Sequence, residues 1–538
     1  MATRKDELSA YSFARKRTVA AFLAPSPGGS EEGAPRPLKT VMPSLIVGVV
    51  LVVGCVGWGV IKPSAPKGWD TPGQYIIVDS DSTTRYVVLE DKGAGGKKVP
   101  TLHPVLNYAS AKLLLDKGKG TVLEVKGSEI DKSGIAHGST LGISYAPDRL
   151  PTAADAEKVK VWAVCERPSS GTTTNIDRAV FVLNEKDASA VTDPKKGALG
   201  PRDVLYVTDS KDAKTIGAQY IVDSNGTRFL IGDPKTIEGT PKGTAQEQLR
   251  AAVIGGSSIP QRVSTEWLNT LNDGGTIAFP TIPGTGTPTT AKGNLPAEAQ
   301  TVGTVVKAKD AQGDQYYVVL QDQIAMISPF VAQLILAEHD VSGNGAAVAV
   351  PVSTGAVIAA NGAAAQTFYA NKGWPKSGLK WANTSEVTEG LKARNTSCSV
   401  YKGTVSAGKV AKPELTAWAG SAYPKNVVAE SLNAYVSSGS GLLFKEISGT
   451  VAGGGAQYLL TDTGLRYALP ANNDSTAENA ATSTSPSTGE DASETDKART
   501  RLGYEKVAAT ALVPATWAEF IPKGPTLDTG AASQPQGQ

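Results

Sequence analysis

The clearest pattern along this chain is an alternation of apolar and polar residues that occurs twice in nearly the same form. AQYIVDSNGTRFLI (218–231) and AQYLLTDTGLRYAL (456–469) both begin Ala-Gln-Tyr and later carry a glycine, an arginine and an aromatic residue. Side chains of a strand point alternately to its two faces, so each half of the pattern predicts one strand. Because Asn225-Gly226 tolerates the positive φ of a tight turn, both copies are predicted to be β-hairpins.

Two further segments repeat the hairpin less closely. GQYIIVDSDSTTRYVV (73–88) has a longer turn, and DQYYVVLQDQIAMI (314–327) lacks the glycine and the arginine. Each hairpin is followed by a proline that opens an apolar run, and proline suits the first turn of a helix; these residues are Pro104, Pro260, Pro329 and Pro514. The predicted repeat is a hairpin plus a helix, too small to be stable alone. Four repeats are predicted, at 68–118, 201–272, 300–344 and 451–522, with Arg228 and Arg466 covering apolar surface rather than binding a ligand.

The longest apolar run predicts a membrane-spanning helix. Residues 40–61 contain no charged side chain, and 22 residues in a helix extend about 33 Å, which matches the hydrocarbon thickness of a bilayer. A cleavable signal peptide is the alternative, but its apolar core would lie closer to the N-terminus than 39 residues. The first 39 residues hold seven basic side chains, whereas only Lys62 and Lys67 closely follow the run. The positive-inside rule therefore predicts a cytoplasmic N-terminal segment (1–39), one span (40–61) and an exported remainder.

The segment before this run, RKDELSAYSFARKRTVAAFL (4–23), predicts an amphipathic basic helix. Leu8, Tyr11, Val19 and Phe22 fall along one helical side, three basic residues follow one another at 15–17, and a proline at 25 ends the pattern. Such a helix could rest on anionic lipid beside the span, or it could dock to a cytoplasmic partner subunit. Both arrangements favour basic charge next to a bilayer, so the sequence leaves the two open.

The spacing of the repeats predicts the architecture of the exported part. Long tracts at 119–200 and 345–450 separate each outer repeat from its inner neighbour, so the order reads nearly the same in both directions. The predicted fold is an elongated α+β exported domain, in which four hairpin-plus-helix repeats surround a central, mainly β domain with pseudo-twofold symmetry. Polar, weakly hydrophobic sequence predicts a flexible linker at 283–293, a disordered insertion at 471–498 and a disordered tail at 523–538.

The composition predicts a disulfide and argues against nucleic acid as a partner. The chain has 538 residues, enough for several domains, and its 53 basic and 51 acidic residues leave a net charge of only +2, which gives no overall field for nucleic acid. Cys55 lies in the predicted span, so an oxidising exterior favours a bridge between Cys165 and Cys398, one in each half of the central domain. Two buried free thiols are the alternative. A zinc site would need further ligands close by, and the sequence has none.

The sequence contains no recognised catalytic motif. His103, His137 and His339 are widely separated and lack metal-ligand spacing, and no G-x-S-x-G motif occurs. GAGGKKV (93–99) fails as a phosphate-binding loop, because Val99 stands where such a loop needs Ser or Thr to hold magnesium. No catalytic residue, cofactor or metal site is therefore predicted.

Several motifs together resemble those of the EccB family, a membrane core component of actinobacterial type VII secretion systems. TRKDELSAYSFARKRTVAAFL (3–23) is similar to the family's N-terminal motif, from which it departs at Lys16 and Phe22. GISYAPDRLP (142–151) and WAVC (162–165) are similar to the central-domain signature, and Cys398 matches the second family cysteine. The resemblance runs nearly end to end.

The resemblance implies a cytoplasmic helix, a single span, and four exported repeats around a disulfide-bonded centre. It also implies self-association and assembly with an EccC-like motor ATPase and with EccD-like and EccE-like subunits, into a complex that exports WXG-type proteins. The residues expected to dock to those partners are Tyr11, Phe13, Arg15, Lys16 and Arg17. A structural and assembly role is the first hypothesis. An exported ATPase, which would need ATP, and a cell-wall-binding module are the alternatives, since family members are described as ATPases and repeated units can bind polymers.

Overall fold

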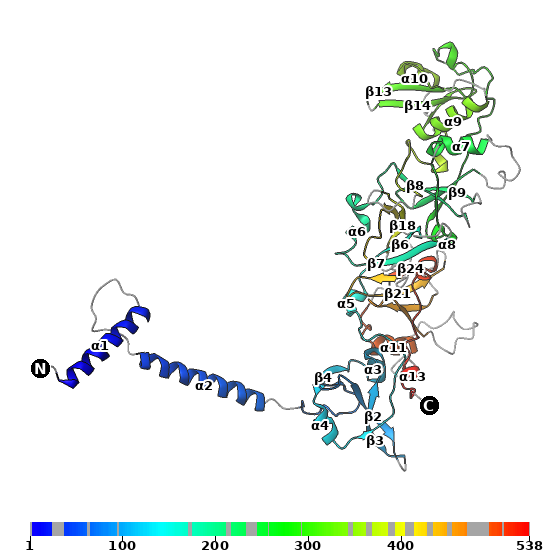
Figure 1. The fold of residues 1–538 in the computed structure, drawn as a ribbon. Coiled ribbons are helices and arrows are strands. Elements are labelled where there is room, and N and C mark those ends of the chain that lie inside the picture. The colour runs from blue at the N-terminus through cyan, green and yellow to red at the C-terminus, as the bar shows by residue number, and fades with distance from the viewer. Residues whose placement is uncertain are drawn as a thin grey trace. The chain divides into compact units, whose positions relative to one another are not determined.

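The chain folds into two compact units (Figure 1). The first unit comprises Met1–Trp69, Asp79–Thr83 and Leu123–Gly134, and the second comprises Asp70–Val78, Thr84–Val122 and Ile135–Gln538. The computed structural model describes residues 3–23, 37–61, 65–93, 96–169, 175–210, 217–232, 245–256, 258–291, 293–311, 313–342, 348–361, 368–385, 393–403, 414–427, 434–448, 455–470, 494–507 and 511–536.

The first helix of the first unit, α1 (Arg4–Leu23), begins with a reciprocal cap. The hydroxyl of Thr3 donates to the carboxylate of Asp6 at 2.6 Å, and the backbone N–H of Thr3 donates to the same oxygen at 3.0 Å. The side-chain and backbone hydrogen bonds from Thr3 hold the pKa of Asp6 below its ordinary value. A carboxylate at this position also complements the positive end of the helix dipole, so the sequence Thr-Arg-Lys-Asp defines the start of α1.

The second helix, α2 (Pro37–Ile61), contains the whole of the predicted span. It begins at a proline, where the missing N–H has no intrahelical partner to lose, and Pro43 lies within it. Its side chains at 37–41 and 56–61 lie outside the described residues. Within the part of the chain that the structure describes, no helix meets the combined length and apolarity needed to cross a membrane. The unit also includes α4 (Gly127–Lys132), which follows β4 (Thr121–Val125).

Among the described residues, the strands of the second unit form five sheets with both parallel and antiparallel pairs. The first has neighbours β1 (Tyr75–Asp79), β2 (Arg85–Lys92), β3 (Lys98–Val105) and β5 (Ala136–His137). The second runs β11 (Gln261–Arg262), β8 (Asp203–Thr208), β9 (Gln219–Val222), β10 (Thr227–Ile231), β12 (Asn272–Ile277), with β17 (Lys380–Trp381) beside β8. The third runs β15 (Ile324–Ile327), β14 (Gly313–Val319), β13 (Val305–Asp310), β16 (Val350–Pro351).

The remaining two sheets contribute buried side chains to one shared hydrophobic cluster. The central sheet runs β19 (Glu414–Gly420), β18 (Thr396–Lys402), β6 (Val161–Pro168), β7 (Ile176–Leu183), β20 (Ala434–Val436). The fifth runs β23 (Arg466–Leu469), β22 (Gln457–Leu460), β21 (Leu442–Ile447), β24 (Ala511–Pro514). Short helices of this unit include α3 (Tyr108–Leu114), α5 (Ala153–Ala156), α6 (Ser189–Thr192), η3 (Pro194–Lys196), η5 (Ala297–Ala299), η6 (Ala370–Lys372) and α13 (Thr529–Ala532).

The last three repeats contain more than the predicted hairpin and helix. In each, a strand precedes the hairpin, a helix follows it, and a short strand then returns parallel to that first strand: β11 beside β8, β16 beside β13, β24 beside β21. The helices after the hairpins are α7 (Ala245–Ile254), α9 (Pro329–Ser342) and α11 (Glu494–Arg501). A second short helix follows each parallel strand: α8 (Thr265–Leu268), α10 (Thr354–Asn361) and α12 (Ala515–Ala518). Parallel pairing requires a crossover, which the helix supplies.

The prolines expected to open helices do so in one repeat. Pro329 is the first residue of α9, whereas Pro514 caps α12 from outside. Pro104 lies within β3, and a two-residue strand separates Pro260 from α8. The helices in those two places are capped instead by the side chains of Asn107 and Ser264, which accept hydrogen bonds from Ser110 and Trp267 backbone N–H groups. At Pro104 and Pro260 the proline was therefore the wrong start signal, and the Asn107 and Ser264 caps were the right one.

The two closely matching hairpins share one turn geometry. In β9–β10 the N–H of Asp223 donates to the carbonyl of Thr227 at 3.0 Å, and Gly226 has φ +64°. In β22–β23, Gly464 takes the equivalent place with φ +78°. A Cβ atom at Gly226 would lie 2.6 Å from the Cβ of Leu415, and one at Gly464 would lie 2.4 Å from the carbonyl oxygen of Ala434. Each turn therefore requires glycine for two reasons: its φ is positive, and its Cα lies too close to the central sheet to leave room for a Cβ atom.

Arg466 has the covering role that was predicted for it. It is buried, its guanidinium lies 4.9 Å from the ring centroid of Tyr458 on the neighbouring strand, and it donates to the Glu446 carboxylate at 2.5 Å. Arg228 is half-buried and donates to the Asn269 side chain at 3.4 Å. Arg466 therefore packs on a ring of its own hairpin, whereas Arg228 contacts the end of α8 in its own repeat.

One core cluster joins the central sheet to the second and fourth repeats. Trp267 of α8 donates its indole N–H to the carbonyl of Val164 in β6 at 2.9 Å. Trp517 of α12 lies 5.5 Å from the ring of Tyr401 in β18, centroid to centroid. The hydroxyl of Tyr401 donates to the carbonyl of Leu512 in β24 at 2.8 Å. Both tryptophans are buried, so corresponding helices of two repeats each insert one large ring beside the central sheet.

Three segments expected to be disordered contain ordered structure. In the tail at 523–538, Leu527 and Ala532 are fully buried in a cluster with α3 and α11, and Asp528 caps α13. The linker at 283–293 is fixed by hydrogen bonds such as that from the Thr289 hydroxyl to the Leu320 carbonyl at 2.7 Å. Residues 471–493 of the insertion lie outside the described residues, but 494–498 begin α11. Polar composition concealed these contacts because few apolar residues make them.

Candidate functional site

The predicted disulfide is present at the centre of the fold. Cys165 of β6 and Cys398 of β18 are directly paired across the central sheet, with a Cα–Cα distance of 4.0 Å. Both cysteines lie in buried stretches of these strands, Trp162–Glu166 in β6 and Thr396–Tyr401 in β18. The sulfur atoms lie among Phe181, Val191 and Trp418. The bridge therefore joins two strands that are 233 residues apart in the chain.

On the other face of β6, a buried carboxylate binds the start of α8. Glu166 is fully buried and accepts hydrogen bonds from the backbone N–H and the hydroxyl of Ser264, both at 2.7 Å. It also accepts from Nε of Arg178 at 2.7 Å. Ser264 in turn caps α8, which carries Trp267. Glu166 therefore fixes the second repeat to the central sheet through charge-assisted hydrogen bonds.

A second carboxylate, in the short helix α5 that precedes β6, holds the turn that leads into the fourth repeat. Asp155 accepts from the Ser440 hydroxyl at 2.9 Å and from the Gly441 N–H at 2.8 Å, and Lys160 donates to it at 3.0 Å. Burial alone would raise the pKa of Asp155, but the bonds from Gly441, Lys160 and Ser440 outweigh it and leave the pKa below its ordinary value. Burial lowers the pKa of Lys160 despite the neighbouring carboxylate. The Asp155–Lys160 ion pair thus helps to connect the central sheet to the fourth repeat.

We expect Asp155→Asn to lower the free energy of unfolding by about 2 kcal/mol at pH 7, since it removes charge-assisted bonds to a buried joint. The loss stays this small because the buried Lys160 ammonium can release its proton. The folded-state pKa of Asp155 is depressed, so its contribution is present above the unfolded value of 3.8 and disappears as pH falls through the folded value. Denaturant unfolding at pH 7 and pH 3 measures both effects.

The matched control for this prediction is Glu185→Gln, which removes one exposed carboxylate from the same unit. Its unfolding free energy should stay within about 0.5 kcal/mol of the unaltered chain. A gap between Asp155→Asn and the unaltered chain that is as wide at pH 3 as at pH 7 would contradict the assigned role of the charge.

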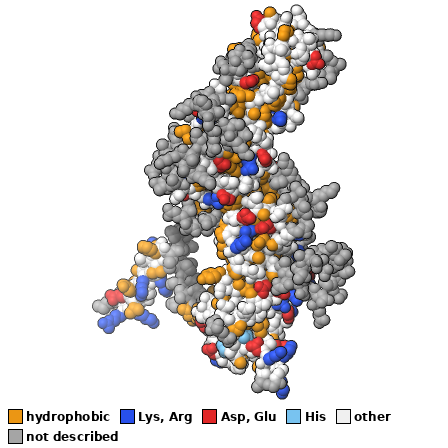
Figure 2. All heavy atoms as spheres, turned by 90° about the vertical axis from the view of Figure 1, so that its right-hand side faces the viewer, with side chains coloured by type: hydrophobic (Ala, Val, Ile, Leu, Met, Phe, Trp, Pro, Cys, Tyr) orange, Lys and Arg blue, Asp and Glu red, His pale blue; other side chains and the backbone are white. Residues whose placement is uncertain are grey.

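A groove at the edge of the central sheet gathers positive charge. This basic groove encloses about 770 Å³ between the α6–η3 segment and the loop after β19. Five cationic side chains and one carboxylate line it: Lys186, Lys195, Lys196, Arg394, Lys425 and Asp187. On the face drawn in Figure 2, by contrast, acidic and basic side chains are interspersed without a large area of one sign. Sequence reasoning missed the groove, because its residues come from three distant segments.

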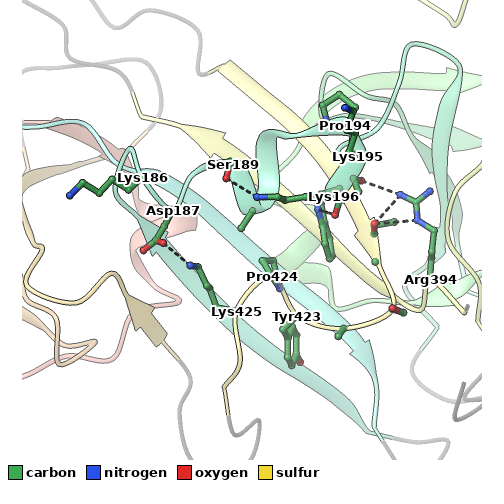
Figure 3. A pocket seen from close by; sticks show the side chains of 17 residues that line it. Lys186, Asp187, Ser189, Pro194, Lys195, Lys196, Arg394, Tyr423, Pro424 and Lys425 are labelled. Atoms are coloured by element: carbon green, nitrogen blue, oxygen red, sulfur yellow. Dashed lines mark hydrogen bonds and ion pairs between the residues drawn. The ribbon is translucent and has the colours of Figure 1, made fainter. Parts of the chain in front are cut away.

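Hydrogen bonds hold the walls of the basic groove in place. Arg394 donates to the carbonyls of Ala419, at 2.9 and 3.2 Å, and of Gly197, at 3.1 Å. The Trp418 indole N–H donates to the carbonyl of Lys196 at 2.8 Å, and the Lys196 ammonium donates to the Ser189 hydroxyl at 2.9 Å. Figure 3 shows these bonds at one end of the groove. The carbonyl partners carry no full charge, so the guanidinium of Arg394 keeps its net positive charge.

The other end of the basic groove contains an ion pair. Lys425 donates to Asp187 at 2.6 Å, and the Ser437 hydroxyl donates to the same carboxylate at 2.6 Å (Figure 3). These two hydrogen bonds, the one from Lys425 first, lower the pKa of Asp187, and the bond to Asp187 raises the pKa of Lys425. Asp187 is thus neutralised by Lys425, and the other four cationic groups of the lining form no ion pair with a carboxylate among the described residues.

The residues predicted to dock to partners lie together on α1. Leu8, Tyr11 and Phe22 share one side of the helix and are exposed, by 73, 75 and 91%. Helical geometry puts Arg15 on that same side, seven residues from both Leu8 and Phe22, whereas Arg17 faces the other way. The expected amphipathic division is therefore weak, since a charge lies in the middle of the apolar side. The residues of the predicted docking site, Tyr11, Phe13, Arg15, Lys16 and Arg17, are all exposed, and Phe13 lies on the opposite side of α1 from Tyr11.

Of the three histidines, His103 has the best-defined surroundings. His103 is buried, with Nε2 at 2.9 Å from the Asp91 carboxylate and Nδ1 at 2.9 Å from the Ser139 carbonyl. His137 lies exposed in β5, and the His339 side chain lies outside the described residues. Across the described ranges, no group of three His, Cys, Asp or Glu side chains is arranged to hold a metal ion.

Comparison with known proteins points to one family. A family model described as "Type VII secretion system ESX-1, transport TM domain B" matches residues 1–537. The ESX-5 secretion system ATPase EccB5 of Mycobacterium marinum is 28% identical over 333 residues, which cover 62% of this chain and 58% of that protein. The ESX-3 secretion system ATPase EccB3 of Mycobacterium tuberculosis is 26% identical over 315 residues, 56% of this chain and 50% of that protein. The match thus spans little more than half the length of these relatives.

Solved structures share the fold. A chain of an intact ESX-5 inner membrane complex superposes with a TM-score of 0.53 at 19% identity, covering 100% of this chain and 96% of that one. A chain of an EccB3 dimer from the ESX-3 core complex gives a TM-score of 0.54 at 21% identity, covering 85% of this chain and 99% of that one. At these identities the likeness concerns the fold.

Proposed function

Because the chain belongs to the EccB family of type VII secretion systems, we propose that it is a structural and assembly subunit of an ESX-type inner membrane complex. In this role it supports the export of WXG-type proteins across the cytoplasmic membrane. The observation that carries the proposal is the family match over residues 1–537. The proposal is also supported by the contacts that connect the central sheet to the second and fourth repeats. The hydrogen bonds of Glu166 and Asp155 and the Cys165–Cys398 bridge hold these modules together.

The proposed topology is a single crossing at 40–61, with α1 in the cytoplasm and the second unit outside. An uncharged run of 22 residues within a 25-residue helix supports the crossing. The excess of basic residues before residue 40 supports the orientation. The disulfide, which persists in oxidising surroundings, supports an exported second unit.

The proposed role of α1 is docking to a protein partner in the cytoplasm. A helix lying on lipid needs an apolar side free of charge, and Arg15 interrupts that side between Leu8 and Phe22. A protein groove can instead pair Arg15 with a carboxylate while it covers the exposed rings of Tyr11 and Phe22 on the same side of the helix. An EccC-like motor ATPase and EccD-like and EccE-like membrane subunits are the proposed partners, and self-association is supported by the solved EccB3 dimer.

We expect a chain with Arg15, Lys16 and Arg17 all changed to Glu to be lost from the assembled complex, because the six-unit change in charge would repel an acidic docking site. Affinity-tagged chain should recover at least about tenfold less of the partner subunits, a loss of roughly 1.4 kcal/mol or more in binding. Quantitative mass spectrometry of the detergent-extracted complex measures the recovery. Circular dichroism and the melting temperature of the second unit should not change, because α1 belongs to the first unit.

The matched control changes Arg4 and Lys5 to Glu at the start of the same helix. Acidic residues are favourable there, so α1 should form and the complex should be recovered in full. Equal recovery of partners from the control and from the triple variant would refute docking through residues 15–17.

The proposed exported body has approximate twofold symmetry about the disulfide. β6 and β18 are paired at its centre, and each contacts a tryptophan from the last helix of one repeat, Trp267 in the second and Trp517 in the fourth. The turn glycines of the same two repeats each approach an edge strand of the central sheet. Such a body offers equivalent surfaces on both halves for contacts with other subunits.

An exported ATPase is the second candidate, favoured by the word ATPase in the names of the relatives. Nucleotide titration of the purified chain, with release of inorganic phosphate as readout, separates the two functions. Turnover that survives removal of contaminating ATPases would support the enzyme, and its absence would support the scaffold.

A further inference from the structure

We propose that the basic groove binds an extended anionic ligand that carries at least two phosphate or carboxylate groups. The inference goes beyond the assembly role, since it concerns a binding site on the central domain. It rests on three properties of the groove: excess positive charge, a fixed geometry, and, toward both ends, cationic groups without a carboxylate partner in the described part of the chain, with Lys186 at the end that holds the Asp187–Lys425 pair.

The charge of the groove exceeds what its own carboxylate can neutralise. Asp187 is occupied by Lys425 and Ser437. Lys186 and Lys195 are exposed, and the ammonium of Lys196 has a neutral hydroxyl as its hydrogen-bond partner. Cationic groups gathered in a hollow raise the local concentration of anions more than the same groups on an open surface. An anion entering here would meet positive charge from several directions.

Arg394 is the strongest single indicator. Its three hydrogen bonds to the carbonyls of Gly197 and Ala419 fix the guanidinium plane without neutralising it. Burial holds the pKa of Arg394 below its ordinary value, with a smaller opposing effect of Asp203. A bound phosphate or carboxylate would supply the missing negative charge, and a pre-oriented guanidinium favours such groups.

The arrangement in the groove selects an extended ligand over a single ion. Figure 3 shows Lys195, Lys196 and Arg394 toward one end, Lys186 with the Asp187–Lys425 ion pair toward the other, and Tyr423 with Pro424 between them. A volume of about 770 Å³ is in the range of small-molecule sites and far exceeds one phosphate ion. A ligand with anionic groups at both ends and a less polar middle would match this order. A polyphosphate and an acidic oligosaccharide share that chemistry.

The test is isothermal titration calorimetry of the full chain in detergent with two probes, sodium tripolyphosphate and a pentamer of galacturonic acid. We expect binding of at least one probe, weakened at least about tenfold by Lys195→Gln with Lys196→Gln and weakened by added salt. Binding of the first probe alone identifies phosphate, binding of the second alone identifies carboxylate, and binding of both identifies charge and length as the selected features. Failure of both probes to bind at about 1 mM would overturn the proposal.

The control variant, Lys372→Gln with Lys376→Gln, removes the same charge from exposed positions outside the groove lining. Its affinity should stay within about twofold, since distant exposed charges are screened. Equal weakening in both variants would overturn the proposal, because binding would then follow net charge alone. As an independent readout, bound probe should protect Lys195, Lys196 and Lys425 from acetylation while Lys372 and Lys376 react as before. Uniform protection, or none, would also overturn it.

Discussion

The full chain with Cys165→Ala and Cys398→Ala should unfold with a free energy lower by about 5 kcal/mol than the unaltered chain, the largest loss we expect from any small change. The bridge closes a loop of 233 residues, and closing a long loop removes much of the entropy of the unfolded chain. Urea unfolding in detergent without reductant measures the difference. Changing both cysteines avoids a single reactive thiol in the central sheet.

The loop closed by this bridge explains why the expected effect is large. It contains the whole of the second and third repeats, so the unfolded chain without the bridge gains freedom in both at once. Cys55→Ala is the matched control, because this cysteine is free and exposed, and its loss should change the unfolding free energy by less than about 0.5 kcal/mol. A loss below about 1 kcal/mol in the double variant would mean that the bridge is marginal to stability.

The second large effect should come from Glu166→Ala, with a loss of about 4 kcal/mol in the free energy of unfolding. Glu166 is fully buried and accepts three hydrogen bonds, from Arg178 and from two groups of Ser264. Removing the carboxylate leaves the Ser264 donors without their acceptor and releases the N-terminal cap of α8. Trp267 would then be held less firmly on the central sheet. Denaturant unfolding monitored by tryptophan fluorescence measures the loss.

The control for Glu166→Ala changes Glu266, the second carboxylate near Arg178. Its guanidinium also lies 3.6 Å from Glu266, whose side chain is 69% exposed, so Glu266→Ala removes a carboxylate from the same arginine without opening the core. An exposed pair contributes little, and the expected change is below about 0.5 kcal/mol. Glu166→Gln should fall between the two, because it keeps the shape and loses the charge. Similar losses from Glu166→Ala and Glu266→Ala would contradict the assignment of the buried joint.

Local patterns along the chain predicted the parts of the fold that depend on neighbouring residues. The hairpins at 218–231 and 456–469 form as expected because alternation and a glycine turn act within about 14 residues. The start of α1 follows equally from Thr3 and Asp6, three residues apart. The disulfide was predictable by elimination, since Cys165 and Cys398 remain once Cys55 is placed in the apolar run.

Features that need distant residues escaped prediction. The parallel strands β11 and β16 have two residues each, too few to show any period, and they exist because a strand of the same sheet lies beside them. The order of the tail depends on Leu527, whose burial requires helices from other parts of the chain. The basic groove needs Lys196, Arg394 and Lys425 together, and no local motif connects three residues that lie so far apart along the chain.

By itself, the sequence determined which segments form hairpins, where an uncharged run of 22 residues lies, and which family the chain resembles. Tertiary structure decided how the modules join, through Glu166 on one side of β6 and Asp155 in the preceding helix α5, and where positive charge is left without a carboxylate. The physical reason is the separation along the chain of the residues that each interaction connects. Backbone conformation and side-chain alternation act between near neighbours, whereas desolvation and charge pairing act between whatever residues the fold brings together.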